Sequence, residues 1–253
     1  EEGEKRSAFG SRGMCRCVVK TTKRFDYVTK LATTTAELRA VASLRSTVFR
    51  EEYDKLITIA SAIASPQKGR ILATVEWDRL EKAIANQNDI ENGNGKALLL
   101  CVSAWLGGRC DAKVKDTILS EVDRSTLVAQ EGCSEEPAPV IGSLDLSTKL
   151  PKDVARVVDE SQSLSAGVSS VAYVSNVGVL SGARCCGVAG AMLEFAQDQA
   201  LERGIEYVFT HAHKSEMHNR NLLYFKHGYV VQQSESNEEA LKDTVLLGTS
   251  LLK

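Results

Sequence analysis

The segment FDYVTKLA, from Phe25 to Ala32, alternates between hydrophobic and polar residues, and this period of two predicts a strand. The pattern then changes to that of a helix from Ala36 to about Tyr53. One face of this helix collects apolar residues at helical spacing, at Leu38, Val41, Leu44 and Val48. Thr34 precedes the helix and Glu37 follows three residues later, which is the signature of a capping box. A strand that leads into a capped helix is therefore expected.

The same patterns continue along the chain. They predict a second helix over Ala73 to Ala85, a third from the stretch after Leu180 to about Arg203, and a short helix in NLLYFKHGYV. Strands are predicted over Ala97 to Trp105, Pro139 to Ser147, Val171 to Leu180, Gly204 to Ala212 and Thr244 to Leu252. The order strand, helix, strand after residue 170 favours a right-handed crossover, which places those two strands side by side and parallel. The predicted fold class is mixed α/β with one sheet.

One domain over residues 25–253 accounts for this pattern, because 253 residues is near the upper limit for a single hydrophobic core. Two polar stretches, residues 107–139 and 151–167, are interpreted as insertions, the first with a short helix around Thr117 to Val128. Residues 1–24 are set apart as a basic leader or a disordered tail, because Lys5 to Arg24 holds seven basic residues and no acidic one. Such a segment resembles the end of an organelle transit peptide, and the tail of a truncated chain explains it equally well.

Composition narrows the classes of function. Hydrophobic residues make up 43% and charged residues 25% of the chain, as in ordinary soluble globular proteins. The formal net charge of -2 provides no field that would attract a nucleic acid, and the longest apolar runs, such as Ala97 to Leu106, are too short to cross a bilayer. Seven cysteines, an odd number in a chain of this size, favour a reducing compartment. We therefore expect neither a nucleic acid nor a membrane as partner.

The stretch LSGARCCGVAGAML, from Leu180 to Leu193, joins an arginine, two adjacent cysteines and several small residues at a predicted helix start. A metal site, a redox pair and an anion cradle can each be built from these residues. A helix start presents unpaired amides and the positive end of its dipole, and it binds phosphate when the backbone can come close. Arg184 adds a charge, and small side chains leave the first turn open at Gly187, Ala189 and Gly190. An anion cradle would use the amides of Cys185, Cys186, Gly187, Val188, Ala189 and Gly190.

The same residues resemble a known family. Arg184-x-x-Gly187-x-Ala189 matches the R/Q-x-x-G-x-G/A loop of the GNAT acetyltransferases. The loop follows a strand that ends with Val177, Gly178 and Val179, where the family has a hydrophobic-x-Val pattern, and LLYFKHGY lies at the spacing of the family's L-Y-x-K-x-G-F segment. The resemblance implies a GNAT fold, with a mixed and mostly antiparallel central sheet, a splayed parallel strand pair and flanking helices.

Within this superfamily, AYVSNVGVLSGARCCGVAGAML is similar to the plastid-type enzymes of plants and algae, which acetylate protein N-termini and lysines. The resemblance implies acetyl-CoA as co-substrate, a protein or peptide amine as acceptor, no metal, and a monomer or homodimer. It also implies a chloroplast location, and a cytoplasmic one is expected otherwise. Two alternatives stay open: a small arylalkylamine as the acceptor, and a GNAT-fold module that binds acetyl-CoA without turnover.

The resemblance also implies roles for individual residues. Val177, Gly178 and Val179 would hold the pantetheine arm through main-chain hydrogen bonds, and residues 184–190 would hold the pyrophosphate. Tyr224 matches the tyrosine that contacts the cofactor and donates a proton to its sulfur. The base is expected to be a carboxylate or a held water, with Asp145 as the first candidate and His211 or His213 as others. Met217 replaces an asparagine that often contacts pantetheine, so Asn219 or Asn221 is expected to supply that contact.

Other interpretations compete with these roles. The four histidines, at positions 211, 213, 218 and 227, lie within 17 residues and invite a zinc site, but no acidic or cysteine ligand stands beside them at regular spacing. Cys185 and Cys186 would act as a redox pair if a strained disulfide joined them. Tyr224 lies among Leu222, Leu223 and Phe225, where an aromatic side chain is ordinarily part of the core.

Overall fold

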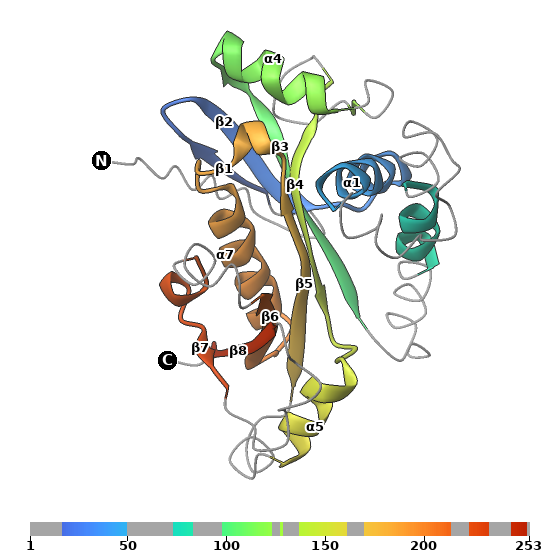
Figure 1. Cartoon of the computed structure of the whole chain (residues 1–253), viewed down its shortest axis with the longest axis vertical. Helices are drawn as coiled ribbons and strands as arrows, with labels where there is room; N and C mark the ends of the chain where they lie inside the picture. The colour runs from blue at the N-terminus through green and yellow to red at the C-terminus, as the bar shows by residue number, and fades with distance from the viewer. Residues whose placement is uncertain are drawn as a thin grey trace.

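The computed structural model of the chain describes residues 17–49, 73–82, 98–122, 127–128, 137–160, 170–213, 223–232 and 244–251. The strands within these residues form one eight-stranded sheet in the order β1-β2-β3-β4-β5-β6-β8-β7 (Figure 1). They are β1 (Cys17–Thr21), β2 (Phe25–Leu31), β3 (Leu99–Cys110), β4 (Val140–Ser147), β5 (Val171–Val179), β6 (Tyr207–His213), β7 (Val230–Val231) and β8 (Thr244–Ser250). β5 and β6 are parallel, and the other neighbouring pairs are antiparallel. The predicted class, a mixed and mostly antiparallel α/β sheet with one parallel pair, is confirmed.

The parallel pair diverges along its length. Pairing extends no further than Val174, which lies opposite Thr210. β5 continues beside β4 to Val179, while β6 continues beside β8 to His213. The carboxyl-terminal halves of the two strands therefore separate in the middle of the sheet, which is the splay that the resemblance implies.

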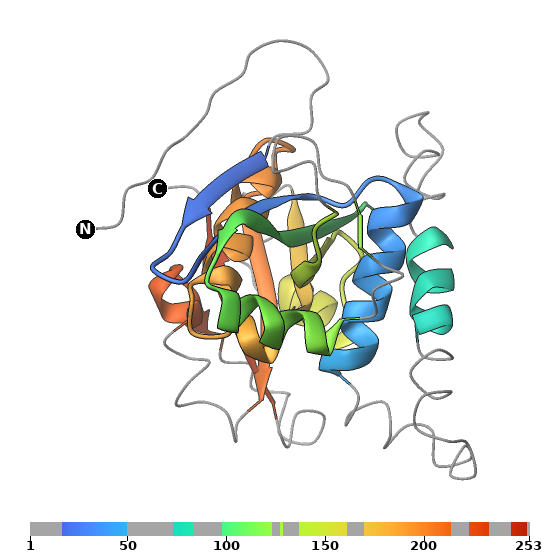
Figure 2. The same cartoon turned by 90° about the horizontal axis from the view of Figure 1, so that it is seen from above.

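Helices cover both faces of the sheet (Figures 1 and 2). They are α1 (Thr35–Val48), a helix over residues 73–82, α4 (Ala112–Glu121), α5 (Lys152–Glu160), the short η3 (Ser181–Ala183) and α7 (Val188–Leu201). Two neighbouring glycines show which helix covers which face. A Cβ built on Gly178 would meet Val48 of α1, whereas one built on Gly142 would meet Met192 of α7. Gly142 lies opposite Val179, the neighbour of Gly178 on β5. Because successive residues of a strand point to opposite faces, Gly142 and Gly178 face opposite sides, and α1 and α7 therefore cover opposite faces at the centre of the sheet.

α1 begins where the sequence predicts. The Thr34 hydroxyl accepts a hydrogen bond from the Glu37 amide at 3.2 Å, and the Glu37 carboxylate accepts one from the Thr34 amide at 3.0 Å. This is the predicted capping box, which satisfies two of the amides that a helix start leaves unpaired. The apolar stripe faces the core, with Leu38, Val41 and Leu44 buried. The helix ends at Val48, five residues before the predicted end at Tyr53.

Residues 17–21 belong to the sheet, whereas the sequence placed all of residues 1–24 outside the fold. β1 pairs with β2 over its whole length and forms one edge of the sheet. Its side chains alternate between exposed and half-buried. Lys20 is typical of an edge strand, where a charged side chain discourages pairing with another chain. The half-buried positions are Val18 and Lys20, so the sequence of this strand carries no alternation of apolar and polar residues that would have predicted it.

The first polar stretch is also more regular than predicted. β3 extends five residues beyond Trp105 to Cys110, and α4 starts at Ala112 instead of near Thr117. Gly107 suggested a loop, but a Cβ there would lie 2.8 Å from the Asp26 carbonyl oxygen on β2, so the glycine permits a close approach of two strands. Asp111 caps α4 by accepting hydrogen bonds from the amides of Lys113 and Val114, the second and third residues of the helix.

The second polar stretch contains α5. Its Val154 and Val157 are buried against Phe209 of β6 and Leu246 of β8, in a cluster separate from the main core. The predicted insertion over residues 151–167 is therefore partly a packed helix. The helix predicted over Ala73 to Ala85 is confirmed for residues 73–82, and its last three residues lie outside the described part of the chain.

Candidate active site

The loop after β5 places a helix start at the open end of the diverging strands. Gly187 is the N-cap of α7 and has a φ of 78°, in the left-handed region that favours glycine. The first hydrogen bond of the helix joins the Ala191 amide to the Gly187 carbonyl at 3.0 Å. The amides of Val188, Ala189 and Gly190 precede this bond, so the helix offers them no acceptor. This is the local geometry that the anion-cradle interpretation requires.

Glu121 of α4 fixes the beginning of this loop. Its carboxylate accepts hydrogen bonds from the amides of Ser181 and Gly182, at 2.8 and 3.0 Å, and from the Ser181 hydroxyl at 2.5 Å. These two amides are occupied, so an anion would have to bind further along, at residues 185–190. The sequence contained no signal for this contact, because Glu121 lies 60 residues before Ser181.

The side chains of the loop differ in their surroundings. Arg184 is exposed, and its Nε donates to the carbonyl oxygen of Val179 at 3.1 Å, which uses one of its five N–H groups. Cys185 is exposed, Cys186 is half-buried, and both are free thiols. Gly190 was predicted to open the cradle, but a Cβ there would lie 3.0 Å from His227 Nε2. The small size of Gly190 therefore also serves the packing of His227 against α7.

The predicted pantetheine residues lie on the edge of β5 that no described strand pairs with beyond Val174. The Leu180 amide bonds to the Ile141 carbonyl on β4 at 3.0 Å, and Gly178, two residues earlier, pairs with Ser143 on the same strand. Backbone groups of a strand alternate between its two neighbours, so those of Val177 and Val179 point away from β4. These groups therefore point toward the side of β5 on which β6 pairs with it only as far as Thr210.

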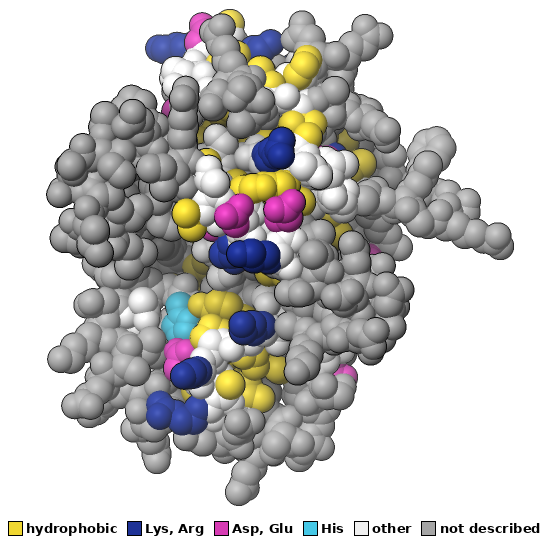
Figure 3. All heavy atoms as spheres, turned by 90° about the vertical axis from the view of Figure 1, so that its right-hand side faces the viewer, with side chains coloured by type: hydrophobic (Ala, Val, Ile, Leu, Met, Phe, Trp, Pro, Cys, Tyr) yellow, Lys and Arg dark blue, Asp and Glu magenta, His cyan; other side chains and the backbone are white. Residues whose placement is uncertain are grey.

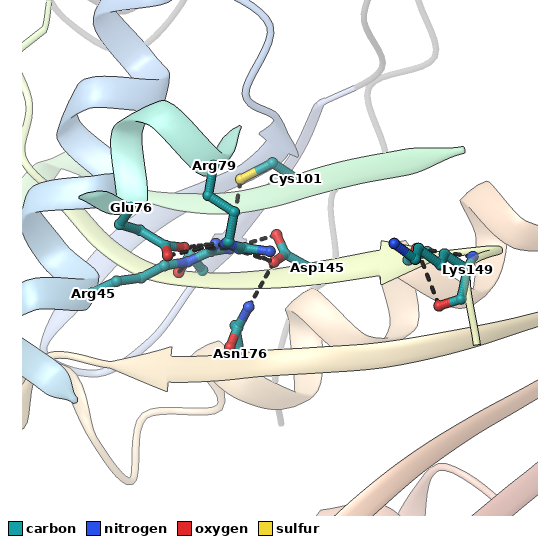
Figure 4. A network of polar contacts seen from close by, with 9 residues as sticks. Arg45, Glu76, Arg79, Cys101, Asp145, Lys149 and Asn176 are labelled. Carbon is teal, nitrogen blue, oxygen red and sulfur yellow. Dashed lines mark hydrogen bonds and ion pairs between the residues drawn. The ribbon is translucent and has the colours of Figure 1, made fainter. Parts of the chain in front are cut away.

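Asp145, the first candidate for the base, is instead the centre of a buried ion network (Figure 4). Its Oδ1 lies 2.6 Å from Arg45 Nη2, and its Oδ2 lies 3.1 Å from Arg45 Nη1 and 2.6 Å from Arg79 Nη2. Oδ2 also accepts a hydrogen bond from Asn176 Nδ2 at 2.8 Å. Burial acts to raise the pKa of Asp145, but Arg45 and Arg79 outweigh it and hold that pKa below its ordinary value. This geometry disfavours Asp145 as a base, because both oxygens are engaged and the carboxylate resists protonation.

His211, a second candidate for the base, lies where the strands separate. It follows Thr210, the last residue of β6 that pairs with β5. Its Nδ1 is 2.7 Å from the hydroxyl of Tyr173 on β5. Its Nε2 lies 3.0 Å from Asp153 Oδ2 on α5, at an angle outside hydrogen-bond geometry. Burial lowers the pKa of His211, and the Asp153 carboxylate offsets part of this effect. His211 is therefore neutral near pH 7 and able to accept a proton.

Tyr173 and Asp153 are site residues that the sequence did not suggest. Burial raises the pKa of Tyr173 to about 12, and Asp153 and Tyr224 contribute to the rise. Tyr173 therefore keeps its proton near pH 7 and can donate it to Nδ1 of His211 in the tautomer that leaves this nitrogen unprotonated. Asp153 lies on α5, within the stretch that the sequence analysis interprets as a polar insertion. Only the tertiary structure shows that its carboxylate lies beside His211.

Tyr224 lies in a helix whose described residues are 223–226. It is 5% exposed and packs in the main core, with its ring edge-on to Tyr229 at a centroid distance of 5.5 Å. Burial suits both interpretations of this residue, a core aromatic and a proton donor inside a closed site. Asn219, the predicted polar contact to pantetheine, lies outside the described residues, as do Met217 and Asn221.

Figure 3 looks onto the face that carries α1, the helix over residues 73–82 and α5. Acidic and basic side chains of described residues lie side by side there, together with apolar ones and a histidine.

Among the described residues, no three His, Cys, Asp or Glu side chains gather as a metal site would require. His218 and the side chain of His213 lie outside the described part. None of the described helices is both long and apolar enough to cross a membrane.

Comparison with known proteins adds a likeness of fold. No family model matches the chain, and no curated protein matches it. The PaiA N-acetyltransferase of Thermoplasma acidophilum, solved with coenzyme A, is 10% identical with a TM-score of 0.46, covering 88% of this chain and 98% of that one. FeeM, an N-acyl amino acid synthase from uncultured soil microbes, is 10% identical with a TM-score of 0.49, covering 89% and 91%. A putative N-acetyltransferase from Lactobacillus plantarum is 17% identical with a TM-score of 0.40, covering 88% and 99%. TM-scores below 0.5 support no conclusion about chemistry, which depends on the geometry of this chain.

Proposed function

We propose that the chain is an acetyl-CoA-dependent N-acetyltransferase of the GNAT type. The observation that carries this proposal is the position of the loop over residues 184–190. It follows β5, which continues past the point where the parallel strand β6 leaves it, and it leads into α7 with the Arg184-x-x-Gly187-x-Ala189 pattern of the family. A strand edge that no described strand covers, leading to a helix start, suits an elongated ligand with a phosphate at one end.

Acetyl-CoA would bind along this path. The pantetheine arm would pair with the outward backbone groups of Val177 and Val179, as an added strand does. The diphosphate would lie against the amides of residues 185–190, at the positive end of the α7 dipole, with Arg184 beside it. The thioester would then lie near the start of the splay, between Val177 on β5 and His211 on β6.

The reaction needs a neutral amine, a polarised carbonyl and a proton for the departing thiolate. The amine nitrogen forms a bond to the acetyl carbon, and the carbon-sulfur bond breaks. Tyr173 passes its proton to Nδ1 of His211 and receives the proton of the amine. The amide of Val177 stabilises the oxygen that becomes negative, and Tyr224 donates a proton to the thiolate of coenzyme A. No metal is needed for these steps.

The acceptor is proposed to be a protein, through N-terminal α-amines and lysine ε-amines. The similarity of AYVSNVGVLSGARCCGVAGAML to the plastid-type enzymes supports this choice, and with it a chloroplast location. Import of the labelled precursor into isolated chloroplasts tests the location. A small arylalkylamine as the acceptor and binding without turnover are the two outcomes that would replace the proposal.

Thiol release from acetyl-CoA tests the proposed function directly. We expect release to depend on added peptide, from a library that contains free α-amines, and separately internal lysines behind blocked N-termini. Mass spectrometry of the peptides should place one acetyl group on the amine. Turnover with an arylalkylamine and none with peptides would favour the small-molecule acceptor. Coenzyme A binding with no turnover on any amine would favour the non-catalytic module.

The pH dependence of transfer tests the role of His211. The base works when it is unprotonated, and burial lowers the pKa of His211, so we expect the part of the acid limb of kcat that comes from His211 to lie below its ordinary value of 6.5. Asp153 raises that pKa, so Asp153→Asn should lower it and move the acid limb of kcat to a lower pH. The amine ionises identically with both enzymes, so the difference between the two profiles reports on the enzyme.

Asp116→Asn is a matched control, because Asp116 is an exposed carboxylate on α4 far along the chain from His211. Its profile should coincide with that of the unchanged protein. An acid limb that stays in place in Asp153→Asn, or that moves to a higher pH, would contradict the assignment of His211 as the base.

A further inference from the structure

β5 contains a bulge at the point where it leaves β6. On the neighbouring strand β4, Asp145 pairs with Ser175 and Ser143 pairs with Gly178, with a shift of register between them. Two residues of β5, Asn176 and Val177, therefore lie opposite one residue of β4. A bulge of this kind bends its strand and redirects the backbone that follows.

Asn176 adopts a left-handed conformation in this bulge, with a φ of 53°. Among the described non-glycine residues, only Asn176 and Cys185 have positive φ. Asparagine tolerates this region better than most side chains, and its short amide can form a local hydrogen bond that fixes the turn. Glycine would tolerate the conformation equally well, but only the asparagine adds an amide that can make a specific contact.

That contact is the bond from Asn176 Nδ2 to Asp145 Oδ2, at 2.8 Å (Figure 4). Asp145 is wholly buried, and Arg45 and Arg79 hold its carboxylate from α1 and from the helix over residues 73–82. Glu76 accepts from both arginines, at 2.7 and 2.8 Å, so the two positive and two negative charges balance. Burial raises the pKa of the adjacent Cys101 to about 12, which makes it a neutral thiol. The acceptor that holds Asn176 is therefore fixed from several elements.

The geometry points to Asp145 and Asn176 as positioning residues: the ion network fixes the carboxylate, the carboxylate fixes Asn176, and Asn176 sets the direction of the Val177 amide toward the thioester carbonyl. This inference rests on the proposed function, because it assigns Asp145 to the alignment of the acetyl group. Neither residue touches the reacting atoms. The bulge acts on the thioester and not on the diphosphate, which binds ten residues further along the chain.

Three substitutions of Asn176 test the inference, with kcat, the Kd of coenzyme A and the melting temperature measured for each. Asn176→Ala removes the hydrogen bond and disfavours the left-handed turn. Asn176→Asp keeps the size but places a second carboxylate against Asp145. We expect both to lower kcat by about tenfold or more, since a displacement of 1 Å in a reacting geometry can cost about 100-fold. The Kd of coenzyme A should change by less than kcat does, because the loop over residues 185–190 and the backbone of Val179 hold the cofactor away from the bulge and only the contact to Val177 is shared.

Asn176→Gly adopts the left-handed conformation without strain but lacks the hydrogen bond. We expect its kcat to lie between that of the alanine variant and that of the unchanged protein. It also keeps the test decisive if Asn176→Ala fails to fold. Gln199→Ala is the matched control, since Gln199 is another buried amide, near the far end of α7. It should lower the melting temperature and leave kcat unchanged.

Full kcat in Asn176→Ala or in Asn176→Gly would overturn the inference. So would a loss of coenzyme A affinity in step with the loss of kcat, because that outcome describes a general disturbance of the fold. The proposed function is judged separately, from the unchanged protein. Its failure to transfer acetyl groups to any amine would count against the function, whereas turnover that is insensitive to Asn176 would count against the inference alone.

Discussion

Gly187→Asp is expected to weaken the binding of coenzyme A by about 100-fold or more. The carboxylate would lie at the N-cap of α7, against the amides that the diphosphate needs. A like charge at 4 Å from a phosphate oxygen costs up to about 4 kcal/mol near a protein surface, and about 1.4 kcal/mol is tenfold in Kd. Titration calorimetry with coenzyme A measures the effect directly and needs no turnover.

Two controls separate charge from conformation. Gly187→Asn has the same size and the same tolerance of the left-handed region without the charge, so it should lose less affinity. Gly204→Asp places the same residue at another left-handed glycine, with a φ of 70° and nothing within 4 Å of its Cβ. It should cost about 1 kcal/mol of stability and leave coenzyme A binding unchanged. An unchanged Kd in Gly187→Asp would remove the diphosphate from this loop.

Tyr224→Phe is expected to lower kcat by about 100-fold or more at saturating substrates, as the loss of a positioned general acid does. The ring stays, so packing in the core and the affinity for coenzyme A should change little. The measurement is the steady-state rate of thiol release, compared with the Kd of coenzyme A for the same variant.

Tyr229→Phe is the matched control. Tyr229 is also buried, lies edge-on to Tyr224 and loses the same hydroxyl. Burial raises the pKa of Tyr229, so this hydroxyl stays protonated through the working range. If Tyr224→Phe transfers acetyl groups at the full rate, Tyr224 is a core aromatic and the thiolate takes its proton from another donor.

The elements that the sequence predicted well are those whose signal is local. α1 begins at its capping box because Thr34 and Glu37 lie three residues apart and need no distant partner. The parallel, side-by-side arrangement of β5 and β6 follows from the right-handed crossover that a strand-helix-strand connection makes. The start of α7 at Gly187 was predictable for the same reason, since a glycine at a helix start is visible in a single stretch of sequence.

The residue that we propose as the base could not be identified in this way. Asp145 and His211 are both polar residues on central strands, and the sequence ranked Asp145 first. Their roles depend on neighbours that are far apart in the chain, since Arg45 lies 100 residues from Asp145 and Tyr173 lies 38 residues from His211. Arginine contacts turn one residue into a buried counter-ion, while burial keeps the other neutral. The pKa of a side chain belongs to its surroundings, which only the packed chain defines.

By itself, the sequence determined the α/β class, the position of most central strands and the loop that starts α7, because period, caps and turn residues act over a few positions. Only the tertiary structure decided where β5 parts from β6, that residues 17–21 complete the sheet and that Glu121 holds the loop. These features depend on hydrogen bonds and charges between segments far apart in sequence. Such contacts carry no periodic signal along the chain.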